Sequence, residues 1–368
     1  MLFPENIPMA VQTYSIIVAS GSYIPSVVIK NSDFLQHEFF DTDGRALTKT
    51  NEVIISQLET ITGIKERRYV TDDLVTSDIA YLAARDALES GGIDAESLDY
   101  IIVAHNFGDV SSQIPVSDMV PALASRVKHR LGIVNPRTVA YDLPFGCAGW
   151  LQGLIQADGY LRSGDATKVL VIGAETLSRI SDPHDRDCMI FADGAGAVVL
   201  EARESAVPIG ILAHHSETFA DELVFALKMG ASNKPGFGVH RLFLKMNGRK
   251  VYEQVLKIVP GVIKKCIDKT GLTLKDIHKV LIHQANNKMD EAILKLLFEL
   301  YEIKSIPDKI MPMTISWLGN SSVATLPTLY DLVSKAHMPE QQFNKGEVIL
   351  FAAVGAGMNV NALVYKNV

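Results

Sequence analysis

One cysteine stands at a position typical of a catalytic nucleophile. Cys147 lies in the run Tyr-Asp-Leu-Pro-Phe-Gly-Cys-Ala-Gly-Trp (141–150), where a strand-like apolar stretch ends at glycines and a helical pattern begins. At the first turn of a helix the backbone N–H groups lack partners and the helix dipole is positive, and both features favour a thiolate. Because the thiolate is the reactive form of cysteine, the position predicts a thiol that forms a covalent intermediate.

Two other polar side chains have a comparable setting. His283 ends the apolar stretch 280–282, and Asn320 lies in the turn-rich segment 316–323. At such turns a side chain can point into a site while the core fixes its backbone. Alone, the histidine would read as structural and the asparagine as a turn residue. Together with Cys147 they predict a catalytic triad of one nucleophile and two hydrogen-bond donors.

The other two cysteines do not share these features. Cys266 lies in a helical pattern and is expected to pack as a small hydrophobic residue, and Cys188 follows a run of charges without a glycine turn. Three cysteines cannot form a disulfide framework, which fits a reducing compartment.

The composition is that of an ordinary globular enzyme, and the N-terminal residues together with the cysteine content predict a cytoplasmic location. The 368 residues are 48% hydrophobic and 21% charged, which excludes a disordered or fibrous chain. The formal net charge of −7 argues against general nucleic-acid binding. No apolar run approaches the ~18 residues of a membrane span, so none is expected. The first residues, 1–8, carry a proline and an acid where a signal peptide needs basic and then apolar residues.

An internal repeat indicates how the three candidate residues are positioned. Residues 84–104 and 263–283 both read as a helix, a turn and a buried strand, and the offset from Gly92 to Gly271 equals that from Lys168 to Glu347. Strands that alternate with helices predict parallel sheets covered on both faces. We therefore predict an α/β protein with two halves, residues 1–205 and 206–368, around one cleft. Chance similarity of two ordinary βα units is the alternative.

Taken together, these motifs resemble the thiolase-fold condensing enzymes, and most closely β-ketoacyl-acyl-carrier-protein synthase III. The resemblance extends along nearly the whole chain, and its segments are 62–68, 141–150, 163–175, 193–197, 246–252, 283–286 and 319–322. It implies a thiolase-like fold in which two duplicated α-β-α halves form five layers, αβαβα.

The resemblance also implies a reaction. Cys147 would take an acyl group from a thioester, while His283 and Asn320 would hold the carbonyl of a malonyl or β-oxoacyl thioester as carbon dioxide leaves. Donors aimed at a developing oxyanion typically contribute ~3–4 kcal/mol each to the transition state. The N–H groups of Cys147, Ala356 and Gly357 would bind the oxyanion of the acyl-cysteine. Neither a metal nor another cofactor is expected. The implied partners are acyl carrier protein, an acyl thioester on coenzyme A or on the carrier, and a second copy of the chain.

Four further residues match positions that bind substrate in the family: Arg186, Val120, Phe191 and Asn286. The arginine usually grips the adenine of coenzyme A together with a tryptophan, but Gln57 stands at the tryptophan position. Because stacking of a base on an aromatic ring is worth roughly 1–3 kcal/mol, this change favours a carrier-bound primer. Val120 matches a gate of the acyl pocket supplied across the dimer, where a small side chain would admit a longer chain. Ala356 interrupts a run of glycines, and a positive φ there would be strained.

A basic face is predicted to dock the carrier protein. Lys288 resembles the basic docking position of the family, and the neighbouring basic residues are Arg249, Lys250, Lys264 and Lys265. Such a face would suit an acidic carrier helix. For each of these residues, ordinary solvated surface charge is the alternative reading.

Three other functions stay open from the sequence. The chain could be a condensing and cyclising ketosynthase that resembles the dialkylresorcinol-forming enzymes, an acyltransferase that forms no carbon–carbon bond, or a scaffold that only binds carriers. The segment His105–Asp109 is either a second polar cluster at the cleft or a turn that ends a strand, and we prefer the turn.

Overall fold

The computed structural model describes residues 11–368, so the segment 1–8, predicted not to be a signal peptide, lies outside the described residues. Two large sheets form the centre of the molecule. The first has the order β1-β7-β6-β4-β5, with β1 (Gln12–Tyr23), β7 (Asp193–Ser205), β6 (Lys168–Thr176), β4 (Tyr100–Ala104) and β5 (Val139–Leu143). The second has the order β11-β12-β13-β8, with β11 (Ile277–Ile282), β12 (Val348–Gly355), β13 (Asn359–Lys366) and β8 (Gly210–Thr218).

The two sheets repeat one topology, which supports the predicted duplication. The order β1-β7-β6-β4 of the first sheet corresponds to β8-β13-β12-β11 of the second, and β5 is an additional edge strand. The predicted boundary between residues 205 and 206 stays a prediction. It falls in the connection between β7, which ends at Ser205, and β8, which begins at Gly210.

The prediction of wholly parallel sheets was wrong, because both sheets are mixed. Strand β4 runs parallel to β5 and β6, and β11 runs parallel to β12. In contrast, β6–β7, β1–β7, β12–β13 and β13–β8 are antiparallel. Strands β12 and β13 are joined by a short turn at residues 356–358, which only an antiparallel pair allows. The alternation of helices and strands in the sequence identified the helix-connected strands and missed this return.

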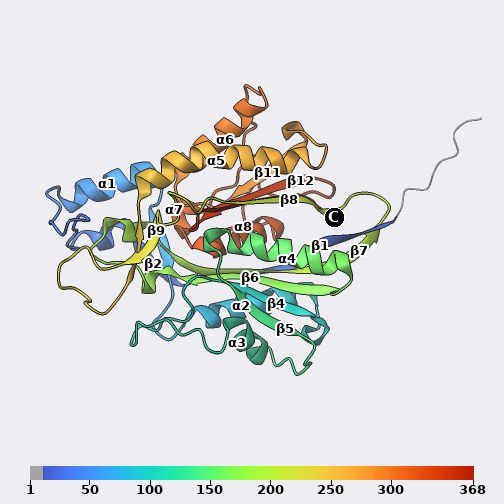
Figure 1. The fold of residues 1–368 in the computed structure, drawn as a ribbon, viewed down its shortest axis with the longest axis horizontal. Helices are drawn as coiled ribbons and strands as arrows, with labels where there is room; N and C mark the ends of the chain where they lie inside the picture. Colours follow the sequence, from blue (N-terminus) through green and yellow to red (C-terminus); the bar gives the residue numbers. More distant parts are fainter. Residues whose placement is uncertain (1–10) are drawn as a thin grey trace, which may run out of the picture.

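The helices complete five layers, as predicted (Figure 1). Helices α4 (Gly149–Ser163) and α8 (Thr325–Ser334) lie between the sheets and contact both. Helices α2 (Thr76–Gly91) and α3 (Leu123–Arg130) cover the outer face of the first sheet, and α5 (Gly248–Asp268) and α6 (Asn287–Leu300) that of the second.

The central layer is apolar because both of its sides face a sheet. In α8 nine of the ten residues are buried, from Thr325 to Val333. Trp150 of α4 packs in the same cluster as Phe351 of β12 and Tyr365 of β13. A helix that is apolar all round is stable only where it is enclosed in this way. The shared core fixes α4, and therefore its N-terminus, relative to the second sheet.

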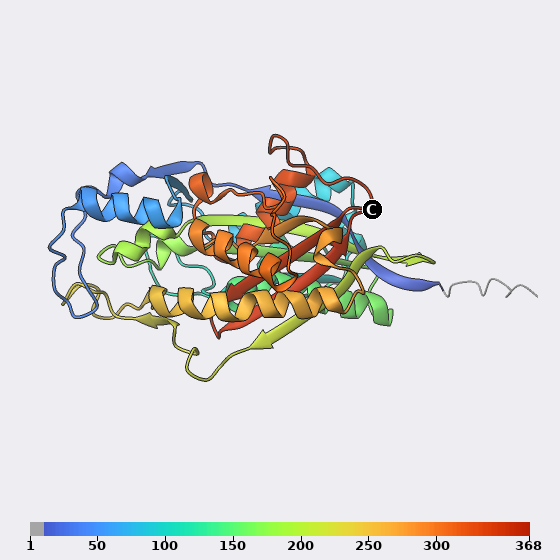
Figure 2. The ribbon, with the colours of Figure 1, turned by 90° about the horizontal axis from the view of Figure 1, so that it is seen from above.

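Smaller elements gather at one end of the molecule, the end at which Figure 2 shows α1 (Asn51–Thr62) in blue. They are the antiparallel pair β2 (Val27–Lys30) and β3 (Glu66–Tyr69), the antiparallel pair β9 (Leu227–Gly230) and β10 (Phe243–Met246), and the short helix α7 (Ile315–Leu318). Within residues 11–368, no helix combines the length and the apolar character that a membrane span requires.

Candidate active site

Cys147 lies at the N-terminal end of the central helix α4, as the sequence predicted. Strand β5 ends at Leu143, Gly146 takes a left-handed φ of 61°, and a single 3-10 turn over Gly146–Ala148 leads into α4. A left-handed φ is readily adopted by glycine and costs other residues energy, which explains the glycine directly before the cysteine.

The backbone of the second half touches this turn directly. An added Cβ at Gly355, the last residue of β12, would lie 2.3 Å from the Cys147 nitrogen, and one at Gly146 would lie 2.6 Å from the Ala356 nitrogen. The strain considered for Ala356 is absent, since the positive φ of this loop, 132°, belongs to Gly357. Ala356 lines the cavity beside Cys147, whereas Gly357 is not part of its wall. The oxyanion roles of both residues stay predictions.

The close approach of Gly355 to Cys147 predicts that a side chain at position 355 would disturb the site. Gly355→Ala should push the loop away from Cys147, lowering the free energy of unfolding by about 1–3 kcal/mol and slowing alkylation of the thiol. Gly159→Ala in α4 is the matched control, because nothing lies within 4 Å of its added Cβ, and it should raise helix stability by about 0.5–1 kcal/mol. Denaturant unfolding and timed alkylation measure both effects. Equal behaviour of the two variants would contradict the tight contact.

His283 enters the same site from the second half. It follows β11 and is held by the hydrogen bond from its backbone nitrogen to Ala352 O at 2.9 Å. Its side chain is almost fully buried, and burial lowers the pKa of His283 to about 4, so the ring is neutral at neutral pH. Nδ1 is buried and has no hydrogen-bond partner among the described residues. The geometry therefore leaves Nε2 as the nitrogen that can meet a ligand.

Asn320 presents its amide group as a donor. Its backbone pairs with residues 190–192, through Asn320 N to Ile190 O at 3.0 Å and Ala192 N to Asn320 O at 2.8 Å. Its side-chain Oδ1 accepts a hydrogen bond from Ser322 N at 2.9 Å. Because the oxygen is occupied and no hydrogen bond of Nδ2 to another described residue is found, the amide N–H groups are free to bind an oxygen in the cavity.

A single cavity brings the three predicted residues together. Its volume is about 240 Å³, and Cys147, His283 and Asn320 all line it. The rest of the wall is mainly apolar and includes Phe107, Leu177, Phe191, Leu227, Met229, Leu244, Met246, Val251, Met289 and Met358. Few neighbouring side chains can form hydrogen bonds with the three polar groups in place of a substrate. An apolar wall also suits an acyl chain.

The thiol itself differs from the expectation of a resting thiolate. Burial raises the pKa of Cys147 to about 11, a hydrogen bond from Ser322 lowers it, and the charge of Glu175 raises it. The sequence shows the helix N-terminus, but the loss of solvent around the sulfur depends on tertiary packing and outweighs it. The resting side chain is therefore a protonated thiol at neutral pH.

A polar cluster lies beside the sulfur, and the sequence analysis missed its members Ser322 and Glu175. Ser322, with a φ of 53°, donates its hydroxyl to Cys147 Sγ at 3.3 Å. Asn106 lines the cavity and bonds the buried Glu175, and His105 pairs through Nε2 with Asp142 Oδ2 at 3.0 Å. The segment 105–109 directly follows strand β4, which agrees with the turn that we preferred from the sequence. It also contributes His105 and Asn106 to this polar cluster. The available signal was a row of polar residues directly after β4 and at the end of β6.

The substrate positions implied by the resemblance lie in different surroundings. Phe191 is buried in the cavity wall. Asn286 is not part of that wall, because its Oδ1 caps α6 by accepting Met289 N at 3.1 Å. Arg186 and Gln57 are both exposed, and Gln57 accepts a hydrogen bond from Lys49. Val120 is 86% exposed and outside the cavity of its own chain.

The predicted docking face divides into two places. Helices α5 and α6 pack together, and their first turns adjoin the cavity through Val251 and Met289. Arg249 and Lys288 lie at these first turns. Lys264 lies about 22 Å further along α5, at about 1.5 Å per residue, so it is too distant to form one compact patch with them. Lys264 and its neighbour also form ion pairs, with Asp268 and Glu217 respectively.

The remaining cysteines are structural. Cys266 is fully buried in the apolar core of the second half, and burial raises the pKa of its thiol to about 12. Cys188 is buried among apolar residues, and burial raises its pKa further. All three cysteines of the chain are unpaired.

A cysteine at a strand-to-helix junction of one half, opposed by donors from the duplicated second half, is the arrangement of the thiolase-fold condensing enzymes. The fold and the cavity assign the protein to this class.

Comparison with known proteins narrows the class to one family. Family models described as 3-oxoacyl-[acyl-carrier-protein] synthase III and its C-terminal region match residues 141–218 and 267–367. A β-ketoacyl-[acyl-carrier-protein] synthase III of Xanthomonas campestris pv. campestris is 33% identical over 357 residues, 95% of this chain and 97% of the relative. The chain therefore belongs to the β-ketoacyl-[acyl-carrier-protein] synthase III family, as the motifs predicted.

Solved structures agree with this assignment. The β-ketoacyl-[acyl carrier protein] synthase III of Thermus thermophilus is 30% identical and superposes with a TM-score of 0.77, covering 95% of this chain and 98% of its own. The priming β-ketosynthase of a polyketide biosynthetic pathway is 25% identical, with a TM-score of 0.79 and 99% of both chains covered.

Proposed function

We propose that this condensing enzyme extends an acyl thioester by decarboxylative Claisen condensation through an acyl-Cys147 intermediate. The observation that supports it is the convergence of one thiol and two neutral donors, Cys147, His283 and Asn320, on one apolar cavity. In the first step Cys147 attacks the acyl thioester, its sulfur takes the acyl group, and the donor leaves as a free thiol. This half-reaction is the acyltransferase part of the activity.

The second step uses the two donors. Carbon dioxide leaves the extender thioester, and the electron pair of the broken bond forms an enolate whose oxygen accepts hydrogen bonds from His283 Nε2 and Asn320 Nδ2. The enolate carbon then attacks the acyl-cysteine carbonyl, a carbon–carbon bond forms, and the carbon–sulfur bond breaks. Cys147 leaves as a thiolate and takes up a proton from water to regenerate the thiol. A neutral histidine suits this role, since its Nε2–H group can donate a hydrogen bond to the enolate oxygen while the ring stays neutral throughout the step.

The primer is proposed to be a carrier-bound acyl chain. The apolar residues of β9 and β10 in the cavity wall, Leu227, Met229, Leu244 and Met246, offer an alkyl chain a surface and offer no partner to a polar group. Gln57 provides no aromatic face for adenine, which weakens the case for coenzyme A. Arg249 and Lys288, at the first turns of α5 and α6, are the proposed contacts of an acidic carrier, although Arg249 also pairs with Glu253.

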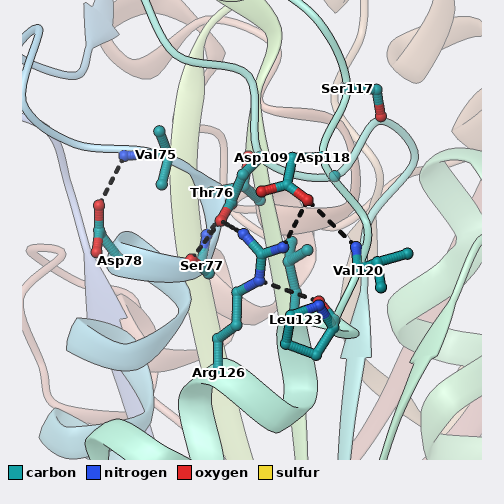
Figure 3. Close-up of polar contacts among 12 residues, drawn as sticks. Val75, Thr76, Ser77, Asp78, Asp109, Ser117, Asp118, Val120, Leu123 and Arg126 are labelled. Carbon is teal, nitrogen blue, oxygen red and sulfur yellow. Dashed lines mark hydrogen bonds and ion pairs between the residues drawn. The ribbon is translucent and has the colours of Figure 1, made fainter.

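A homodimer is proposed as the working form. Strand β5 is the edge of the first sheet, and an uncovered edge can pair with another chain. The loop that carries Val120 is exposed yet anchored, because Arg126 joins Asp109 at 2.7 Å and Asp118 at 2.8 Å (Figure 3). Exposed apolar side chains on so well anchored a loop suit a contact with the second copy. The unpaired cysteines fit the proposed cytoplasmic location.

A primer panel tests the proposal. The enzyme is incubated with acetyl-coenzyme A and with short and medium acyl and β-oxoacyl chains on a carrier protein, and intact mass records the acyl group on Cys147. We expect carrier-bound medium chains to load faster than acetyl-coenzyme A, and a malonyl carrier then to yield a product with a new ketone. A cyclised product from β-oxoacyl chains would indicate the dialkylresorcinol-type reaction. Loading without any new ketone would contradict condensation.

A further inference from the structure

A continuous chain of hydrogen bonds joins a buried carboxyl to the nucleophile. Glu175, in β6, is 1% exposed, and its Oε2 accepts both the backbone N–H of Asn106 at 3.0 Å and the side-chain Nδ2 of Asn106 at 2.8 Å. The same Nδ2 donates to Ser322 Oγ at 3.5 Å, and Ser322 Oγ donates to Cys147 Sγ at 3.3 Å. Three segments far apart in the sequence thus meet at the sulfur.

The direction of these bonds is set by Glu175. A carboxylate only accepts, so it fixes which end of the Asn106 amide carries the donors. With that NH₂ group facing Ser322, a lone pair of the hydroxyl oxygen is engaged and its hydrogen is directed at the sulfur. A hydroxyl that donates to sulfur stabilises the thiolate more than the thiol. The chain therefore orients a donor for the charged form of Cys147.

The charge of Glu175 acts in the opposite sense. Its negative charge raises the pKa of the Cys147 thiol. Burial raises the pKa of Glu175 itself to about 7, against the lowering effects of His105 and Asn106, and Asp193 of β7 raises it further. Two other titratable groups belong to this cluster, Asp142 of β5, which pairs with His105, and Cys147. The carboxyl thus changes charge in the range where the enzyme would work.

We propose that Glu175 is a positioning residue for the nucleophile, which acts through Asn106 and Ser322 to aim a hydroxyl at Cys147 and restrains ionisation of the thiol by its own charge. The inference rests on the proposed role of Cys147. It concerns the reactivity of the sulfur alone, so it can be tested without any condensation assay.

The test is the pH profile of Cys147 modification by methyl methanethiosulfonate, read by intact mass, in the wild type and in Glu175→Gln. Glutamine keeps an oxygen for Asn106 and removes the charge. Above about pH 8 the variant should react about tenfold faster, which corresponds to a thiol pKa lower by about one unit. Below about pH 6, where wild-type Glu175 is protonated, the two profiles should converge. Parallel profiles over the whole range would overturn the electrostatic part.

Two further variants test the positioning part at about pH 9, where Glu175 is ionised and can only accept hydrogen bonds. Ser322→Ala should slow modification about tenfold, because a donor to the thiolate is lost. Asn106→Ala should slow it in the wild-type background and add nothing to Ser322→Ala. Fully additive effects of the two substitutions would overturn the coupling between Asn106 and Ser322.

The control for an isosteric change is Asp290→Asn. Asp290 is a buried acid in α6 without a hydrogen-bond partner among the described residues, and the variant should show the wild-type rate of Cys147 modification. These results hold or fail whether or not the enzyme condenses a given primer.

Discussion

Cys147→Ala is expected to abolish condensation. The variant should keep the fold, since the methyl group of alanine is smaller than the cysteine side chain that it replaces. It has no atom that can hold an acyl group. Removal of a nucleophile leaves only the effects of binding and oriented donors, so we expect a loss of at least about a thousandfold in turnover. Product formation from a carrier-bound primer and a malonyl carrier measures the loss, and intact mass should show no acyl adduct.

The control for this experiment is Cys266→Ala. Its sulfur is buried in the core of the second half and outside the cavity, so the variant should lose packing energy and keep activity. Turnover by Cys147→Ala at the wild-type rate would exclude the acyl-cysteine mechanism. An acyl adduct that persists in Cys147→Ala would place the nucleophile elsewhere in the chain.

The architecture could be read from the sequence because it depends on local patterns that recur. Gly92 caps the end of α2 and Gly271 lies in the turn that follows α5, and the next strands, β4 and β11, occupy corresponding places in the two sheets. The direction of β7 and β13 could not be read in this way. No α-helix links either strand to the one before it, and an apolar run carries no information on its direction.

The three proposed catalytic residues were found because each ends an apolar stretch at a turn. The environment of these residues could not be predicted, because their burial and their hydrogen-bond partners depend on segments that are distant in sequence. The protonated state of Cys147, the neutral ring of His283 and the acceptor contact of Asn320 Oδ1 all depend on packing of the two halves. The local signal for Glu175 is weak, since a glutamate at a strand end is ordinarily a surface residue.

The site separates its two electrostatic tasks between the halves of the repeat. The first half supplies the thiol and the carboxyl that restrains it, Cys147 and Glu175. The second half supplies donors that are neutral or tied by the backbone, His283 and Asn320. Substitutions of His283 and Asn320 should therefore change the decarboxylation step while leaving the thiol able to accept an acyl group.

His283→Ala and Asn320→Asp are expected to separate acyl transfer from condensation. Asn320→Asp keeps an oxygen for Ser322 N but replaces the donor with a negative charge that opposes the enolate. Because one oxyanion donor is typically worth a hundredfold to a thousandfold, we expect each variant to lose about that factor or more in carbon dioxide release. In His283→Ala, which adds no charge beside the thiol, acylation of Cys147 should stay near the wild-type rate.

The measurement follows both steps on the same sample, with intact mass for the acyl-enzyme and released carbon dioxide for the second step. Asn287→Ala, which removes a surface amide that donates to Glu291, is the matched control and should preserve both rates. Wild-type carbon dioxide release in Asn320→Asp would show that this amide does not bind the enolate. An equal loss of both steps in His283→Ala would instead assign the ring to acyl transfer, where a neutral imidazole near a protonated thiol could accept its proton.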